Sequence, residues 1–189
     1  MNQYVKAGNG NGAAVAVGAA GIGVIAGLLI ASTRKSIVQG MEAAAGDWFD
    51  VLKLEHRMVS ALFEKLSQTT NADGPQRLIL FKKIKAGLSK HAFQEENVVY
   101  PALRKADPGG AAQHLNEDHF EIKSLLSEAE QADKSSEEFM AAMNRLQAIV
   151  ETHVREEEDT IFPAFKAKLS EDANAKLTAM LHKEGRKLA

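Results

Sequence analysis

Two segments of the sequence share one spacing of histidine, glutamate, aromatic and proline residues. The first, HAFQEENVVYPA, runs from His91 to Ala102, and the second, HVREEEDTIFPA, runs from His153 to Ala164. In each segment a glutamate follows the histidine by four residues, which is about one turn of an α-helix. One helix face can then offer an imidazole nitrogen and a carboxylate to a metal ion. The repeat therefore predicts a pair of metal ligands in each of two helices.

A second pair of histidines repeats at almost the same interval. Glu55-His56 lies 63 residues before Asp118-His119, and His91 lies 62 residues before His153. The chain is therefore predicted to contain two copies of one helical hairpin, and each copy carries the same set of potential ligands.

Apolar residues one turn away place the four repeated histidines on the faces that form the core. Leu88 and Val150, for example, each precede a histidine by three residues. The predicted metal ligands are His56, His91, Glu95, His119, His153 and Glu157. Imidazole and carboxylate suit iron, manganese or zinc, and two carboxylates can bridge two ions. The alternative is a set of hydrogen-bonded core pairs, but four of the six histidines on core faces favour a metal site.

Four acidic residues lie directly beside these predicted ligands. Glu55 and Asp118 each precede a histidine and are expected at the surface. Glu96 and Glu158 are turned about 100° from their neighbouring glutamates, so we expect them to support the ligands or to face solvent.

Three further residues have weaker signals. His114 lies five residues before His119, so it is expected at the surface or in a loop, and a seventh ligand is the alternative. Tyr100 and Phe162 each lie nine residues after a histidine and are expected on the opposite side, packed in the end of the bundle.

Composition excludes several classes of protein. The chain has 189 residues, 23 of them basic and 25 acidic, and this balance gives no electrostatic indication of nucleic-acid binding. It has no cysteine, so disulfides, thiolate metal sites and thiol nucleophiles are excluded.

The N-terminal part, residues 1–35, contains an apolar run at residues 13–32 that is long enough to span a membrane as a helix. A membrane anchor fits it better than a signal peptide or a soluble core helix. Arg34 and Lys35 follow the run, which favours a cytoplasmic C-terminal part. Its small residues at intervals of four suit self-association into a homo-oligomer. Residues 36–46 are expected to form a connector, and a soluble cytoplasmic protein is the alternative.

Helical periodicity of apolar residues dominates the rest of the chain, and no window alternates as a strand does. Residues 47–169 are predicted to form an up-and-down four-helix bundle of the all-α class, followed by a short helix and a basic tail at 170–189. The helices are expected at about 47–68, from 75 to near Pro101, at 111–132, from Ser136 to near Pro163, and from Ser170 to near Gly185. Both prolines are expected to kink or end their helices.

The bundle resembles the hemerythrin-like HHE cation-binding domains. The similar phrases are LKLEHRMVSALF, HAFQEENVVYPAL, NEDHFEIKSLL and HVREEEDTIFPAF, and they extend over nearly the whole predicted bundle. The resemblance implies a non-haem centre of two iron ions with an oxo or hydroxo bridge. The six predicted ligands would stand in the ligand positions, and Glu95 and Glu157 would be the bridging carboxylates.

Two departures from the oxygen-carrying members bear on function. Those proteins have an HxxxH pair on the third helix and HxxxxD on the fourth, whereas here Leu115 takes the first place of that pair and the fourth helix has HxxxE. One iron would lack an imidazole, which leaves a coordination position for dioxygen, nitric oxide or peroxide. We expect binding or sensing of such a molecule or of iron. The alternatives are a di-iron oxidase, peroxidase or iron–sulfur repair-type stress enzyme, and a structural membrane protein stapled by metal.

Overall fold

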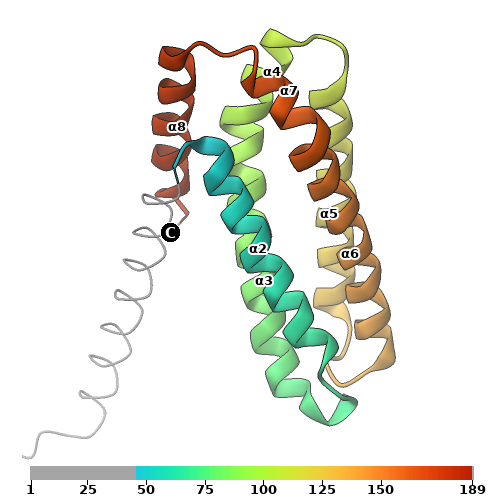
Figure 1. Cartoon of the computed structure of the whole chain (residues 1–189). Helices are drawn as coiled ribbons and strands as arrows, with labels where there is room; N and C mark the ends of the chain where they lie inside the picture. Colours follow the sequence, from blue (N-terminus) through green and yellow to red (C-terminus); the bar gives the residue numbers. More distant parts are fainter. Residues whose placement is uncertain (1–45, 189) are drawn as a thin grey trace, which may run out of the picture. The chain divides into compact units, whose positions relative to one another are not determined.

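The computed structural model describes residues 46–188, and every regular element in that part of the chain is helical (Figure 1). The elements are α2 (Trp48–Ser67), η1 (Asn71–Asp73), α3 (Gly74–Gln94), η2 (Glu95–Val99), α4 (Tyr100–Ala106), α5 (Ala111–Gln131), α6 (Glu137–Glu156), η3 (Glu157–Ile161), α7 (Phe162–Lys166) and α8 (Glu171–Gly185). Helices α2, α3, α5 and α6 run alternately down and up as a bundle. The predicted all-α bundle and its short C-terminal helix are therefore confirmed.

The predicted membrane anchor at residues 13–32 lies outside the described residues. Among the helices of residues 46–188, none combines the length and the apolar composition that a membrane span requires.

Short polar side chains begin α2 and α6, and they satisfy backbone N–H groups that the first helical turn leaves free. Asp47 accepts hydrogen bonds from the backbone of Phe49 and Asp50, and Ser136 accepts one from Phe139. Gly110 precedes α5 with φ of 99°, a conformation that glycine adopts without strain. These positions explain why the helices begin close to the predicted residues.

Pro101 and Pro163 do not end their helices, which is one of the two outcomes predicted for them. Each proline lies in the first turn of a helix that directly follows a π-helical turn. The backbone N–H of Tyr100 donates to Glu95 O, and that of Phe162 donates to Glu157 O, which are bonds to the fifth residue before. A proline has no N–H to donate to the carbonyl four residues before it. The wider π-helical turn accommodates this missing hydrogen bond. Both helices therefore continue past the predicted metal ligands.

The histidine and glutamate residues lie in a polar layer between two apolar clusters. One cluster includes Val59, Leu88, Ile122 and Val150, and the other includes Trp48, Leu52, Val99, Leu115 and Phe162. The pairs α2–α3 and α5–α6 form the two predicted hairpins. Helix α8 packs on the first hairpin, where Trp48 donates to Asn174 and Thr178. Close packing on both sides fixes the height of the polar layer in the bundle.

Leu146→Ala tests whether this core supports the bundle. Leu146 is fully buried in the first apolar cluster, so its truncation should lower the free energy of unfolding by about 2–5 kcal/mol. Urea unfolding followed by circular dichroism measures the change. Met180→Ala, at an exposed residue of α8, is the control and should shift it by less than about 0.5 kcal/mol. An equal effect of the two substitutions would contradict this packing.

Candidate metal centre

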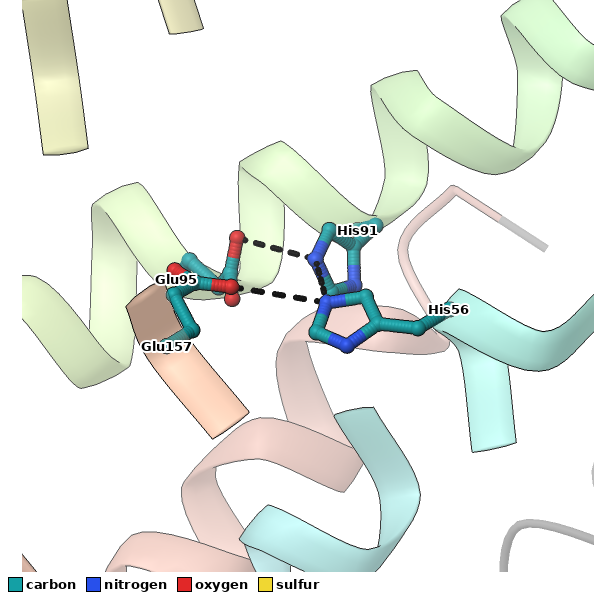
Figure 2. Close-up of side chains that lie close together, drawn as sticks. All are labelled: His56, His91, Glu95 and Glu157. Carbon is teal, nitrogen blue, oxygen red and sulfur yellow. Dashed lines mark hydrogen bonds and ion pairs between the residues drawn. The ribbon is translucent and has the colours of Figure 1, made fainter. Parts of the chain in front are cut away.

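All six predicted ligands are buried, and they converge at one level of the bundle. Their relative exposure is 8% for His56, 4% for His91, 0% for Glu95, 2% for His119, 3% for His153 and 0% for Glu157. Figure 2 shows the imidazoles of His56 and His91 directed toward the carboxyl groups of Glu95 and Glu157. We call these six side chains the inner cluster.

The donor atoms of the inner cluster fall into two overlapping groups, each of which could hold a metal ion. His56, His91, Glu95 and Glu157 form the first group, and Glu95, His119 and His153 form the second. Within each group one donor atom of every residue lies within 4.8 Å of the others. The shared Glu95 joins the two groups into one centre.

Each glutamate contacts one histidine of the pair His56 and His91 and one histidine of the pair His119 and His153. Glu95 Oε2 lies 3.1 Å from His91 Nε2 and 3.3 Å from His119 Nε2. Glu157 uses two oxygens: Oε2 lies 3.4 Å from His56 Nε2, and Oε1 lies 3.3 Å from His153 Nε2. Both carboxylates therefore stand between the histidine pairs, which is where a bridging ligand of two ions must lie.

Every imidazole of the inner cluster is held from outside by a carboxylate of another helix. The Nδ1 contacts are His56–Glu158 at 2.8 Å, His91–Glu55 at 2.9 Å, His119–Glu96 at 2.9 Å and His153–Asp118 at 3.1 Å. A carboxylate accepts hydrogen bonds, so Nδ1 carries the proton of the neutral imidazole and donates it. The lone pair of Nε2 then points into the cluster, which is the tautomer that a metal ligand needs.

These four outer carboxylates close a ring around the bundle. The contacts run from α2 to α3, from η2 to α5, from α5 to α6, and from η3 back to α2. Each long helix thus contributes one imidazole to the centre, and the carboxylate that fixes it comes from a neighbour.

The predicted surface position of Glu55 was wrong. Its side chain is only 8% exposed, and its other oxygen accepts a hydrogen bond from Lys90. Asp118 is also partly buried, at 22% exposure of its side chain. The sequence did contain a signal: Glu55 directly precedes His56 and Asp118 directly precedes His119, and an acidic residue lies five residues after both His91 and His153.

Several polar atoms of the inner cluster have no hydrogen-bond partner, although they are buried. They are Glu95 Oε1, Glu157 Oε2 and His153 Nε2. The 3.4 Å contact of Glu157 Oε2 with His56 does not have the geometry of a hydrogen bond. In addition, His56 Nε2 and His91 Nε2 face each other at 2.9 Å, where their two lone pairs repel when each ring carries its proton on Nδ1 alone. Unpaired buried acceptors are costly, and a cation ligated by imidazole and carboxylate removes that cost.

Protons compete with a cation for the centre. Burial by itself lowers the pKa of His119, but the hydrogen bonds to Glu95 and Glu96 and the charge of Glu95 outweigh it and raise the pKa to about 9. Burial likewise opposes ionisation of Glu95, yet the neighbouring histidines hold the pKa of that carboxyl well below its usual range. The metal-free centre therefore holds protons near neutral pH, and metal binding must release them.

Tyr100 is part of the centre, which corrects its predicted place on the opposite side. Its hydroxyl lies 2.8 Å from Glu157 Oε1, 3.3 Å from Glu95 Oε2 and 3.1 Å from His119 Nε2. Residues five apart are separated by about 140° on an α-helix, but the extra residue of the π-helical turn brings Tyr100 onto the face of Glu95. Phe162 occupies the equivalent place in the second copy and packs in the apolar cluster, as predicted.

His114 does not join the inner cluster. Its side chain is 52% exposed and contacts Glu156 on the outside of the bundle. Its predicted surface position is confirmed, and the alternative of a seventh ligand in the same centre is wrong.

Comparison with known proteins identifies the family. The sequence model of the hemerythrin HHE cation binding domain matches residues 48–165, which is more than half of the chain. The chain belongs to this family. The resemblance inferred from the repeated phrases is therefore confirmed, and so is an HHE domain with a buried histidine–glutamate cluster that could bind metal cations.

Two similar proteins extend the comparison. A DNA nickase from Nostoc sp. (strain PCC 7120) is 33% identical over 138 residues, which cover 72% of this chain and 38% of that protein. The chain thus spans well under half the length of this curated relative. The crystal structure of a hemerythrin HHE cation binding domain-containing protein from Mycobacterium kansasii covers 76% of this chain and 87% of its own, with a TM-score of 0.67 and 22% identity. That likeness shows the helical fold.

Glu55→Gln tests the ring of outer carboxylates. The amide keeps the size of the side chain but no longer fixes the His91 tautomer as a carboxylate does, so Fe²⁺ affinity should fall about 10- to 100-fold. Competition with a chromogenic chelator measures it. Glu64→Gln changes an exposed carboxylate farther along α2 and should leave the affinity unchanged. Equal affinities of both variants and the wild type would refute the role of Glu55.

Proposed function

We propose that the inner cluster holds two iron ions and that the pair binds a small molecule. His56 and His91 would hold one ion and His119 and His153 the other, and Glu95 and Glu157 would be shared between them. The observation that carries this proposal is the position of the two glutamates, because each contacts one histidine of both proposed ion positions. Manganese and zinc, which the same donors also suit, are the alternatives.

Six protein side chains do not fill the coordination spheres of two ions. Leu115, at the place of an additional histidine in the oxygen carriers, is fully buried in the second apolar cluster and offers no donor. An open position is typical of sites that bind or transform a ligand, whereas structural sites are closed. This supports binding of an exogenous molecule over a purely structural staple.

A small cavity beside the imidazoles limits the size of that molecule. Its volume is about 20 Å³, and it is lined by all four histidines of the inner cluster and by apolar side chains of the first apolar cluster, among them Val59, Leu88 and Ile122. Such a space holds about one water-sized molecule. Its apolar walls favour dioxygen or nitric oxide, and peroxide also fits. A larger substrate would require the helices to separate.

Tyr100, which does not line this cavity, gives the centre a proton donor. Burial, together with the charges of Glu157 and Glu95, raises the pKa of its hydroxyl well above the usual value, so it stays protonated and donates to Glu157. The second copy has Phe162 instead, and hence the two metal positions are chemically different.

Two alternatives use the same centre. A di-iron oxidase, peroxidase or iron–sulfur repair-type stress enzyme would turn over the small molecule that the cavity admits, and a metal-stapled structural protein would bind none.

Residues 13–32 are proposed to anchor the bundle on the cytoplasmic side of a membrane and to self-associate. Dependence of the purified chain on detergent is the test of that anchor.

The named activity of the Nostoc relative gives a further test. The formal net charge of −2 provides no overall steering toward DNA, and the matched segment is a minor part of that protein, so we propose no nucleic-acid partner here. Supercoiled plasmid incubated with iron-loaded protein should remain intact on an agarose gel. Conversion to the open circle that is lost with His91→Ala would overturn this proposal and make nicking a function of the bundle.

Metal content and absorption together test the proposed function. The iron-loaded full chain should contain about two iron ions and show a near-ultraviolet oxo-iron absorption that changes when dioxygen, nitric oxide or peroxide is added. His91→Ala and His153→Ala should each lose most of the iron, and His182→Ala, which changes a histidine of α8, should retain it. Unchanged iron in the first two variants would refute the site. Spectral change without turnover supports binding, and sustained turnover selects the enzyme alternative.

A further inference from the structure

The two hairpins differ in how their outer faces are covered. On the first hairpin, α8 lies against α3, and Gln94 of α3 donates to the carbonyl of Leu181 in α8. Gly185 of α8 approaches so closely that an added Cβ would lie 2.7 Å from Gln94 Nε2 and 3.3 Å from Lys90. Lys90 in turn covers Glu55. This packing keeps the outer carboxylate of the first hairpin away from solvent.

The second hairpin exposes the equivalent positions. Asp118 corresponds to Glu55 at an interval of 63 residues, and Glu156 corresponds to Gln94 at an interval of 62. Glu156 is 41% exposed, whereas Gln94 is fully buried. The outer face of α5 and α6 therefore presents two carboxylates to solvent at the height of the inner cluster.

A histidine completes this exposed pair. His114 Nε2 lies 2.7 Å from Glu156 Oε2 and 3.9 Å from Asp118 Oδ2, and the three donor atoms lie within 4.8 Å of one another. His114 and Asp118 share one face of α5 because they are four residues apart, and Glu156 comes from α6. One nitrogen and two carboxylates thus converge from two rigid helices.

The internal repeat does not account for His114. The residue 63 positions earlier is Val51, which is fully buried and apolar. An exposed ion pair between His114 and Glu156 alone would contribute little to stability. The third donor, Asp118, makes the arrangement different from a simple pair, since mixed imidazole and carboxylate sets suit divalent transition ions.

We propose that His114, Asp118 and Glu156 form a second, surface site for a divalent transition cation such as Zn²⁺ or Mn²⁺. Three protein donors hold the ion, and water completes its coordination. Asp118 is shared with the buried centre, because its Oδ2 also contacts Nδ1 of His153 at 3.1 Å. The surface site is therefore joined to the inner cluster through a single carboxylate.

Zinc titration of the iron-loaded full chain, followed by calorimetry, tests this proposal. The wild type should bind about one Zn²⁺ per chain beyond its iron. His114→Ala and Glu156→Gln should each weaken this binding about tenfold or more, because each loses a donor. Both variants should keep the iron of the wild type, since neither residue belongs to the inner cluster. His182→Ala is the matched control and should bind Zn²⁺ as the wild type does.

The outcomes separate this site from the buried centre. Zinc binding that is unchanged in both His114→Ala and Glu156→Gln would overturn the surface site, as would the absence of any zinc binding beyond the iron. A wild-type chain that does not hold iron would instead count against the proposed function. The surface site can still be tested in that case, because His91→Ala disrupts only the inner cluster. This variant should retain the Zn²⁺ site that His114→Ala removes.

Discussion

Four imidazole rings must direct Nε2 toward one point inside an apolar bundle, and a carboxylate outside each ring makes that possible. Without Glu55, Glu96, Asp118 and Glu158, each imidazole could rotate or exchange its tautomer. The buried Nε2 atoms could then carry the proton and would have no lone pair to offer a metal ion. The carboxylates come from neighbouring helices, so ligand orientation depends on the register of every helix pair. The apolar clusters above and below fix that register.

The π-helical turns add a second constraint. Each begins at a glutamate of the inner cluster and allows its helix to continue to a proline that would otherwise interrupt the hydrogen-bond ladder. In the first copy the same turn brings Tyr100 to the centre, where its hydroxyl donates to Glu157. The second copy has Phe162 at the equivalent position, so a nearly symmetric scaffold surrounds the inner cluster with different side chains. Leu115, which offers no donor atom, adds to that difference.

Much of this arrangement was predictable from local rules. Helical periodicity, capping residues and the His–Glu spacing indicated the bundle and brought all six inner side chains to one level, since these features depend on short intervals along one helix. What escaped prediction depends on partners from other helices. Glu55 looked like a surface residue because its contacts with His91 and Lys90 arise only when α2 packs on α3. Tyr100 was misplaced because a π-helical turn shifts the phase of every residue after it.

The family match and the geometry agree on a buried cation-binding layer, and the two bridging glutamates give that layer its proposed two ions. Anomalous diffraction at the iron edge from crystals of the iron-loaded chain tests this most directly. The account predicts two peaks about 3.5–4 Å apart, one beside His56 and His91 and the other beside His119 and His153, with Glu95 and Glu157 between them. A single peak, or density outside the inner cluster alone, would contradict it.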